Sequence, residues 1–338
     1  MRDLVIGDVH FGIKSNSMTW LESHLKFFRT QVYDVIETEK PDRVVFLGDV
    51  FDIRYSINTV VGTNIKKLVR EMLTKFNNCK FFFTAGNHDY YSPQIEFEEY
   101  NSYDFVFGEE FANTYPNVKF ITQQPLLDNE TLFLPWYWTE DEDRFSRVMQ
   151  EYKGQFKLIY CHSDLCKWES EKILSKANAL VISGHIHYPW SDKANKLFNV
   201  GACNALTFND VNSERYIYVV ENNVLIKAIE NTTTPKFYRY FNEEIFTLSA
   251  ENFNNASVQL CINTENINKA RYIERIKEIK TTYMSNDIKV VKIDDIMGVA
   301  SGAADFNTNI QEYIEKNIPD YLTPKYQFIK QKIATDKQ

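Results

Sequence analysis

Five of the six histidines in this 338-residue chain stand in short polar clusters, and each cluster directly follows an apolar run. Packing alone does not explain this distribution. In an open α/β sheet, however, the carboxyl ends of the strands meet at one crevice, where such folds place their ligands. We therefore expect five distant segments to converge. They are Gly7-Asp8-Val9-His10, Gly48-Asp49-Val50-Phe51-Asp52, Gly86-Asn87-His88-Asp89, Cys161-His162 and Gly184-His185-Ile186-His187.

The apolar runs predict buried strands separated by amphipathic helices, which is the pattern of an α/β layered fold. Helical spacing is clearest at about 20–36 and 58–77. Later in the chain, adjacent strands with a turn at Asn222-Asn223 predict a hairpin. The expected strands of this first part are 3–6, 43–47, 80–83, 156–160, 179–182, 196–200, 216–220 and 224–229.

The pattern changes after the hairpin, and we predict three parts: a first domain at 1–230, a smaller α+β domain at 236–298, and a helical C-terminal segment at 305–335. The stretch 231–235, rich in threonine and ending in proline, is typical of a linker between the first two. In the second domain we expect strands near 236–241, 257–262 and 288–293 around a helix near 268–284.

Composition limits the cellular setting and the partners. No apolar run approaches the roughly 20 residues that cross a bilayer, and five cysteines without a Cys-x-x-Cys pair fit neither a disulfide framework nor a zinc knuckle. We therefore expect a cytoplasmic protein, or one in the host cytoplasm if a phage encodes it. The formal net charge of −8 argues against binding nucleic acid by bulk electrostatics, unless a partner or a local cluster supplies the basic surface.

The clusters combine carboxylate, imidazole and amide groups, a donor set that suits manganese, iron or zinc. In an extended chain, residues two apart point to the same side, so Asp8 with His10, and His185 with His187, can each hold one ion. Two metals about 3.5–4 Å apart can activate water and stabilise both oxygens of an in-line phosphoryl displacement. The sequence therefore predicts phosphoester hydrolysis.

The ordered motifs Asp-x-His, Gly-Asp-x-x-Asp, Gly-Asn-His-Asp, His and Gly-His-x-His resemble those of the calcineurin-like metallophosphoesterases over about residues 1–230. This resemblance implies an α/β/β/α sandwich core that holds two divalent metal ions, with Mn²⁺ the expected ion. It also implies that His88 acts as a general acid and that Asp52 orients its imidazole. The implied ligands are Asp8, His10, Asp49 and His187 for one metal, and Asp49, Asn87, His162 and His185 for the other, with Asp49 bridging.

Protein phosphatases of this superfamily carry Asp-Arg-Gly and Gly-Asn-His-Glu, whereas this chain has Asp52-Ile53-Arg54 and Gly86-Asn87-His88-Asp89. The whole chain instead resembles the SbcD-type nuclease subunits of double-strand-break repair complexes, on Gly48-Asp49-Val50-Phe51-Asp52, Leu134-Pro135-Trp136 and Asn199-Val200-Gly201-Ala202. It departs from them at Gly201-Ala202, where relatives often have Gly-Ser or Gly-Thr followed by proline, and at Phe11-Gly12-Ile13 in place of Leu-Gly.

That resemblance implies a manganese-dependent DNA exonuclease and endonuclease that acts in end processing, recombination and repair. The implied partners are DNA, a coiled-coil SMC-like ATPase of the SbcC type that binds the C-terminal helices, and a second copy of the chain. Helix 58–77 would be the dimerising element, or else its apolar side packs on the sheet.

Other interpretations stay open. The chain could be a phosphatase or a small-molecule phosphodiesterase of the same superfamily, or a metal-free scaffold with the same fold. His24, in a helical stretch between Leu21 and Phe28, is expected to be a surface or boundary residue. Asp89 either supports the metal ligands or caps a helix.

Overall fold

The computed structural model describes residues 1–293 except 93, 166–176, 212, 284 and 286. The predicted C-terminal segment 305–335 lies outside the described residues. The chain divides into two compact units, which we describe separately. The first comprises Met1–Tyr238 with Asn255–Ser257, and the second comprises Arg239–Asn254 and the described residues from Val258 onward.

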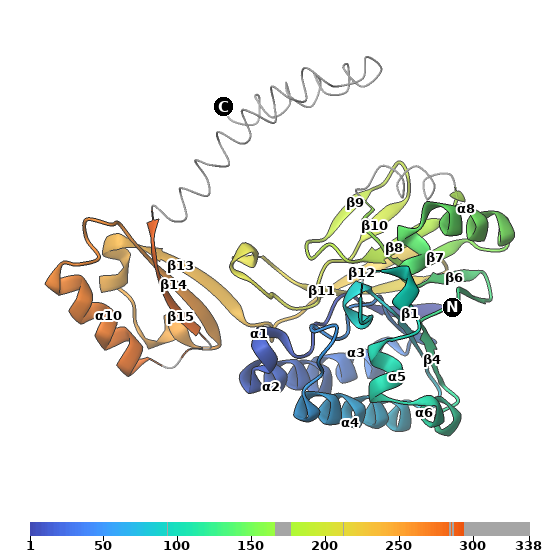
Figure 1. Ribbon diagram of the computed structural model, residues 1–338, viewed down its shortest axis with the longest axis horizontal. Coiled ribbons are helices and arrows are strands. Elements are labelled where there is room, and N and C mark those ends of the chain that lie inside the picture. The colour runs from blue at the N-terminus through green and yellow to red at the C-terminus, as the bar shows by residue number, and fades with distance from the viewer. Residues whose placement is uncertain (93, 166–176, 212, 284, 286, 294–338) are drawn as a thin grey trace, which may run out of the picture. The chain divides into compact units, whose positions relative to one another are not determined.

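Two six-stranded sheets form the centre of the first unit (Figure 1). The first sheet has the order β12 (Val224–Glu230), β11 (Tyr216–Glu221), β1 (Arg2–Ile6), β2 (Arg43–Phe46), β3 (Lys80–Thr84) and β4 (Val118–Ile121). The second has the order β5 (Leu126–Asp128), β6 (Thr131–Leu134), β7 (Leu158–His162), β8 (Leu180–Gly184), β10 (Leu197–Asn199) and β9 (Trp190–Asp192). Strands β1 to β4 are mutually parallel, and so are β6, β7, β8 and β10.

Helices cover the outer face of each sheet, so the first unit has four layers. The helices are α1 (Ile13–Asn16), α2 (Met18–Phe27), α3 (Tyr33–Glu39), α4 (Thr59–Lys75), α5 (Ser102–Val106), α6 (Glu109–Thr114), α7 (Tyr137–Glu140) and α8 (Glu142–Glu151). The first apolar core lies between the first sheet and the helices α2, α3, α4, α5 and α6. A second core lies between the two sheets, and a third lies between the second sheet and α8. This arrangement confirms the predicted α/β/β/α sandwich.

Successive side chains of the central strands pack alternately into two different apolar cores. In β2, Val44 and Phe46 pack toward the helices, whereas Val45 packs toward the second sheet, because successive side chains of a strand point to opposite faces. β3 repeats the pattern, and its Phe83 stacks on Phe46 with ring centroids 4.2 Å apart. Burial on both faces explains why these strands are almost continuously apolar in the sequence.

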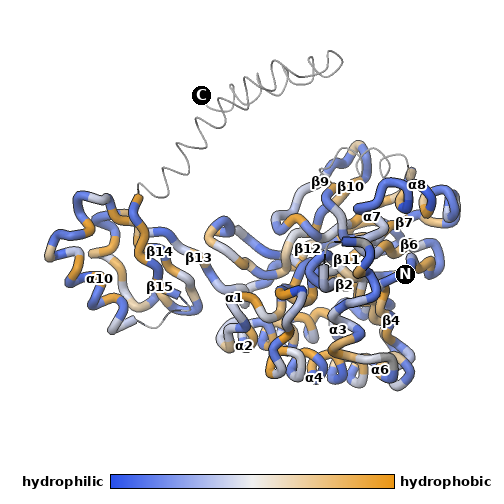
Figure 2. Tube along the Cα trace, in the orientation of Figure 1, coloured by the Kyte–Doolittle hydropathy of each residue, from blue (hydrophilic) through white to orange (hydrophobic). Residues whose placement is uncertain are grey.

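Helix α4 packs its apolar side on the first sheet. Its N-cap is Asn58, whose side chain accepts from the main-chain N–H of Val60 at 2.8 Å. Ile65, Leu68 and Met72 are buried in the core, while hydrophilic residues alternate with them along the helix (Figure 2). Of the two uses considered for this segment, the structure shows packing on the sheet.

The hairpin of β11 and β12 turns at Asn222 and Asn223, which both have positive φ values, as the sequence predicts. The segment that follows, predicted to be a linker, is hydrogen-bonded to the first unit. Asn231 is buried and donates to the carbonyl of Cys203 at 2.7 Å, and the Thr234 hydroxyl accepts from the N–H of Ala205 at 2.8 Å. These hydrogen bonds fix residues 231–234 to the first unit.

The described residues from Lys236 onward contain a three-stranded sheet and one α-helix. The strands lie in the order β13 (Lys236–Phe241), β14 (Ala256–Ile262) and β15 (Asp287–Lys292), and the helix is α10 (Ala270–Thr282). The predicted α+β composition of this part is therefore correct. Within the described residues, no helix is both long and apolar enough to cross a membrane.

Candidate metal centre

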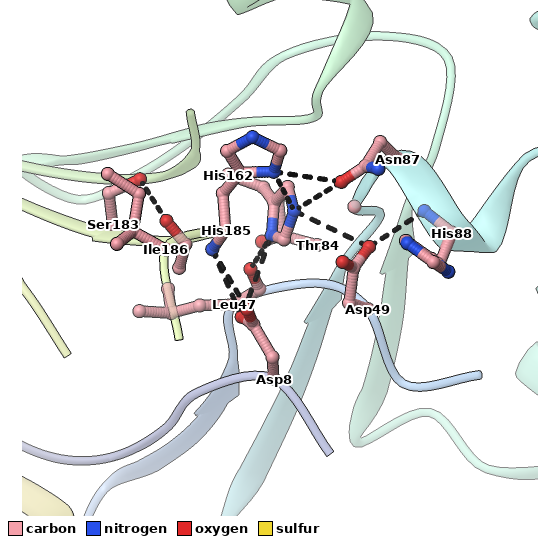
Figure 3. A network of polar contacts seen from close by, with 12 residues as sticks. Asp8, Leu47, Asp49, Thr84, Asn87, His88, His162, Ser183, His185 and Ile186 are labelled. Atoms are coloured by element: carbon pink, nitrogen blue, oxygen red, sulfur yellow. Dashed lines mark hydrogen bonds and ion pairs between the residues drawn. The ribbon is translucent and has the colours of Figure 1, made fainter. Parts of the chain in front are cut away.

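Five parallel strands, three from the first sheet and two from the second, end at the same edge of the sandwich. The polar clusters follow β1, β2, β3, β7 and β8, and their side chains converge there (Figure 3). Close packing of the sheets brings residues more than 170 positions apart into contact. For example, Nε2 of His10 lies 3.1 Å from Nε2 of His187.

Main-chain contacts hold the first two loops together. The carbonyl of Asp49 accepts from the N–H groups of Val9 and His10 at 3.1 and 3.0 Å. His10, Asp49 and His185 all have positive φ values, of 55°, 47° and 87°. Left-handed backbone at residues other than glycine costs about 1–3 kcal/mol each and persists where surrounding contacts enforce it. Three such residues among the predicted ligands indicate that the loops are shaped by the site.

Glycines before the ligands allow the loops to approach closely. Gly48 has a φ of 95°, and a Cβ added there would lie 2.5 Å from Nδ1 of His162. A Cβ on Gly86 would lie 2.3 Å from Oδ1 of Asp49. Neither position has room for another side chain, so both glycines are needed for the ligands to meet.

The first group of ligands comprises Asp8, His10 and His187, whose ligand atoms lie within 4.8 Å of one another. Nε2 of His187 is 3.8 Å from Oδ2 of Asp8, and Nε2 of His10 is 3.8 Å from Oδ2 of Asp49. Nδ1 of His10 faces Oδ1 of Asp52 at 3.1 Å, which directs the other ring nitrogen toward the centre. Carboxylates commonly fix metal-binding imidazoles in this way.

The second group comprises Asp49, His162 and His185, also within 4.8 Å, together with Asn87. Nδ1 of His162 donates to the carbonyl of Leu47 at 2.7 Å, which leaves Nε2 directed at the Asn87 amide oxygen, 3.0 Å away. Nδ1 of His185 lies 2.9 Å from the same oxygen (Figure 3). Three electron-pair donors directed at one point fit a divalent cation.

Asp49 lies between the two groups and offers one oxygen to each. Its Oδ1 is 3.4 Å from Nε2 of His162, and its Oδ2 faces His10. This geometry fits the bridging position. All seven predicted ligands therefore lie in one cluster, and the donor set of carboxylate, imidazole and amide fits two divalent cations with mixed oxygen and nitrogen ligation.

The electrostatics of the cluster favour positive charge. Burial raises the pKa of Asp8 to about 6, whereas the pKa of Asp49, despite its burial, is lowered by His162 and other neighbouring histidines. Burial opposes protonation of His162, but Asp49 and Asp8 raise its pKa to about 9. A cation bound here would compete with that proton, so metal affinity is expected to fall at low pH.

Asp52 contacts His88 through its main chain rather than through its carboxylate, which corrects the predicted role of the side chain. Nδ1 of His88 donates to the carbonyl of Asp52 at 2.6 Å, while the carboxylate faces His10. The loop turns the side chain of Asp52 toward the first ligand group, and only its carbonyl is left to fix the His88 tautomer. His10, Asp52 and His88 also form a third group within 4.8 Å.

Asp89 ties two of the loops together and also caps the short 3-10 helix Asn87–Asp89, so the structure shows both of the roles considered. Its buried carboxylate accepts from the N–H groups of Gly86 and Phe51 at 2.9 and 3.1 Å, and from the hydroxyl of Tyr103 at 3.0 Å. Burial, followed by the charge of Asp49, raises its pKa to about 7.

Arg215 and Asn199 support the last ligand loop, and sequence reasoning assigned no role to either side chain. The buried guanidinium of Arg215 donates to the carbonyl of His187 and to Asp210. The Asn199 amide donates to the carbonyls of Ile186 and Tyr188 at 2.7 and 2.8 Å. Arg215 stands 28 residues after His187, so no local spacing could have indicated the contact.

The prediction that His24 lies at the surface or boundary is wrong. It is fully buried, with its ring edge against Phe11 and Trp20, and neither ring nitrogen has a hydrogen-bond partner. Burial lowers its pKa to about 3, so it is neutral. Leu21 and Phe28 stand three residues before and four after His24, which places it on the buried face of the helix.

Six ligand side chains around a shared carboxylate, at one edge of a four-layer sandwich, are typical of proteins that hold two divalent cations for phosphoester chemistry. A family model described as calcineurin-like phosphoesterase matches residues 1–189. The chain therefore belongs to the calcineurin-like phosphoesterase family, which consists of metal-dependent phosphoester hydrolases. The match includes every predicted metal ligand.

Comparison with curated proteins finds no match. Two of the solved structures that resemble the chain do so at 12% identity. One is "GAP50 the anchor in the inner membrane complex of Plasmodium", with a TM-score of 0.43, covering 69% of this chain and 85% of that one. The other is nuclease MPE of Pseudomonas putida, with a TM-score of 0.32, covering 66% and 87%. Likeness at this level does not bear on the substrate.

Proposed function

We propose that this phosphoesterase is a manganese-dependent DNA nuclease that works with a coiled-coil SMC-like ATPase in end processing and recombination. The observation that carries the proposal is the convergence of all seven ligands beside His88, in a chain whose motifs and layout resemble SbcD-type nucleases. One of the predicted ligands, His187, has a side chain that is 38% exposed, so the metal centre is open to solvent on that side.

Bound divalent cations would lower the pKa of water and neutralise charge on the phosphoryl oxygens. The ligand set is Asp8, His10, Asp49 and His187 for one cation, and Asp49, Asn87, His162 and His185 for the other. Mn²⁺ suits these oxygen and nitrogen donors.

His88 supplies the proton for the leaving group. Because its Nδ1–H is held by the Asp52 carbonyl, Nε2 carries the exchangeable proton of the imidazolium. The attacking water first releases a proton to solvent. As the resulting hydroxide oxygen bonds to phosphorus, the bond from phosphorus to the leaving oxygen breaks, and Nε2 donates its proton to that oxygen. Burial lowers the pKa of His88, which makes its imidazolium a stronger acid.

Incubation of the purified chain with Mn²⁺ and linear or single-stranded DNA, with and without the ATPase, tests the proposal. We expect shortened DNA strands and loss of activity when the metal is chelated. Failure to cut DNA under all these conditions, while nucleotides or phosphoproteins are hydrolysed rapidly, would instead support a phosphatase or small-molecule phosphodiesterase. Metal content near zero after gentle purification, together with no hydrolysis, would indicate a scaffold.

A further inference from the structure

A hollow of about 470 Å³ in the first unit is bordered by exposed aromatic side chains. Tyr55, Tyr91, Tyr100 and Phe105 are 75%, 51%, 56% and 76% exposed. Among the described residues of Met1–Tyr238, the other aromatic side chain exposed to this degree is Tyr188. Aromatic rings are normally buried, so four exposed rings around one hollow mark a binding surface.

The hollow adjoins the metal centre along the chain. Tyr55 stands three residues after Asp52, and Tyr91 three residues after His88. Three residues span at most about 11 Å, so both rings are attached close to the reacting groups. That distance corresponds to about three stacked nucleotides, at about 3.4 Å each.

Main-chain contacts hold two of the rings in place. The N–H of Tyr91 donates to the carbonyl of Tyr100 at 2.9 Å, next to the bridge between Tyr90 and Asn101. Phe97 packs between them, with its ring centroid 5.6 Å from that of Tyr91 and 6.5 Å from that of Tyr100. The part of the hollow that Tyr91 and Tyr100 border is therefore formed before any ligand binds.

The charges of the hollow suit bases better than phosphates. Among the described residues that line it, Arg54 is the one basic side chain, whereas Glu99 and Asp104 are acidic. The guanidinium of Arg54 lies beside the side-chain amide of Asn87, whose oxygen is a predicted metal ligand, so Arg54 adjoins the metal centre. A phosphate is thus favoured at the Arg54 end, and an uncharged aromatic group along the tyrosines.

We propose that this aromatic hollow stacks unpaired nucleobases of the DNA strand whose phosphodiester lies at the metal centre. The proposal rests on the nuclease function and deepens it. Base pairs in a duplex cover each other's faces, so only an unpaired segment offers faces to the rings. Stacking tolerates any sequence because every base has a π-face. The enzyme is therefore expected to prefer single-stranded or frayed ends.

The test compares two oligomers of equal length, oligothymidylate and a chain of abasic sites with the same phosphodiester backbone. Steady-state cleavage by the full chain with Mn²⁺ is measured for the native protein and for Tyr55→Ala/Tyr91→Ala. We expect the variant to raise KM for oligothymidylate about tenfold or more, equivalent to about 1.4 kcal/mol, with kcat little changed. KM for the abasic chain, already high for the native protein, should not change.

Two control variants separate stacking from general damage. Tyr55→Phe/Tyr91→Phe keeps both rings and should retain the native KM, whereas Phe241→Ala removes an exposed aromatic ring outside the hollow and should have no effect. If the native protein cuts both oligomers with equal KM, or if the double alanine variant keeps the native KM, the inference is overturned and the rings are left to a protein partner. If the native protein cuts neither oligomer, the nuclease function itself fails, and this inference with it.

Discussion

His88 differs from the other four clustered histidines in what its ring contacts. Its ring hydrogen-bonds to the main-chain carbonyl of Asp52 and not to a predicted metal ligand, whereas His10, His162, His185 and His187 each direct a ring nitrogen at another predicted ligand. Substitutions at His88 and at a ligand should therefore have different consequences, because one removes a proton donor and the other removes a bond to metal.

The variant His88→Ala is expected to retain both metals and lose about 10²–10⁴-fold in kcat, the usual contribution of a general acid. Metal content and turnover on DNA provide the measurement. A substrate with p-nitrophenolate as leaving group, which needs no proton, should lose far less. The matched variant Asp49→Ala should lose metal. A metal-free His88→Ala protein would show that His88 is a ligand.

The buried His24 predicts a pH dependence of stability. Its pKa is about 3 in the folded protein and 6.5 as the reference value for the unfolded chain. Below pH 6.5 the unfolded state takes up a proton that the folded state does not. Because of this residue, the free energy of unfolding should fall by about 1.4 kcal/mol for each unit by which the pH drops below 6.5, down to about pH 3.

Urea unfolding of the metal-free protein at pH 7.5 and pH 5.5, with native chain and His24→Leu, isolates that contribution. The other histidines are present in both proteins. The contribution of His24 is therefore given by the difference in free energy of unfolding between the native chain and His24→Leu at each pH. We expect His24→Leu to gain stability relative to the native chain as the pH falls. A difference that does not change with pH would mean that folding does not lower the pKa of His24.

The sequence predicted which residues form the candidate metal centre, because metal binding requires particular side chains. It did not predict the direction in which each side chain points. The seven predicted ligands are polar residues at strand ends, so their clustering was visible in the sequence. The direction of the Asp52 carboxylate depends on a loop conformation that no pattern encodes. The burial of His24 could have been inferred from its spacing to Leu21 and Phe28, but a polar residue type argued against it.

At the scale of elements, the strands that carry the site were predictable because they are buried on both faces and read as apolar runs. Short edge strands such as β5 and β9 lack this signal, since their residues are largely half-buried or exposed. Helix α4 was predictable from the spacing of its apolar residues, but the sequence did not show whether they pack on the sheet or on a second copy of the chain. In the structure they pack on the sheet, and a substitution on that side of the helix can test this.

The substitution Leu68→Ala should lower the free energy of unfolding by about 2–5 kcal/mol, because Leu68 is 1% exposed against the sheet. The neighbouring Lys67→Ala, on the exposed side, should change it by less than about 0.5 kcal/mol. Urea denaturation provides both values. A helix that instead served mainly as a dimer contact would show a Leu68→Ala effect that depends on protein concentration.

At the scale of the whole molecule, the site exists because two sheets pack face to face. The core between them aligns the ends of β1, β2 and β3 with those of β7 and β8. The sequence predicted this alignment only through the resemblance of its motifs to those of a known family. The predicted C-terminal helices, at 305–335, contain none of the predicted ligands, so their role can be tested separately.

A chain truncated at residue 305 should keep its metals and its basal cleavage of DNA, but lose binding to the ATPase. The physical reason is that all seven ligands and His88 lie within the first 187 residues. Metal analysis, cleavage assays and co-purification with the ATPase measure the three properties. Retained ATPase binding would place the contact elsewhere on the chain.

The central claim is that seven side chains hold a pair of divalent cations, and anomalous scattering from a crystal soaked in Mn²⁺ tests it most directly. We predict two peaks about 3.5–4 Å apart, with Asp49 between them. A map with no anomalous peak among these side chains, or with peaks only elsewhere on the protein, would contradict the account.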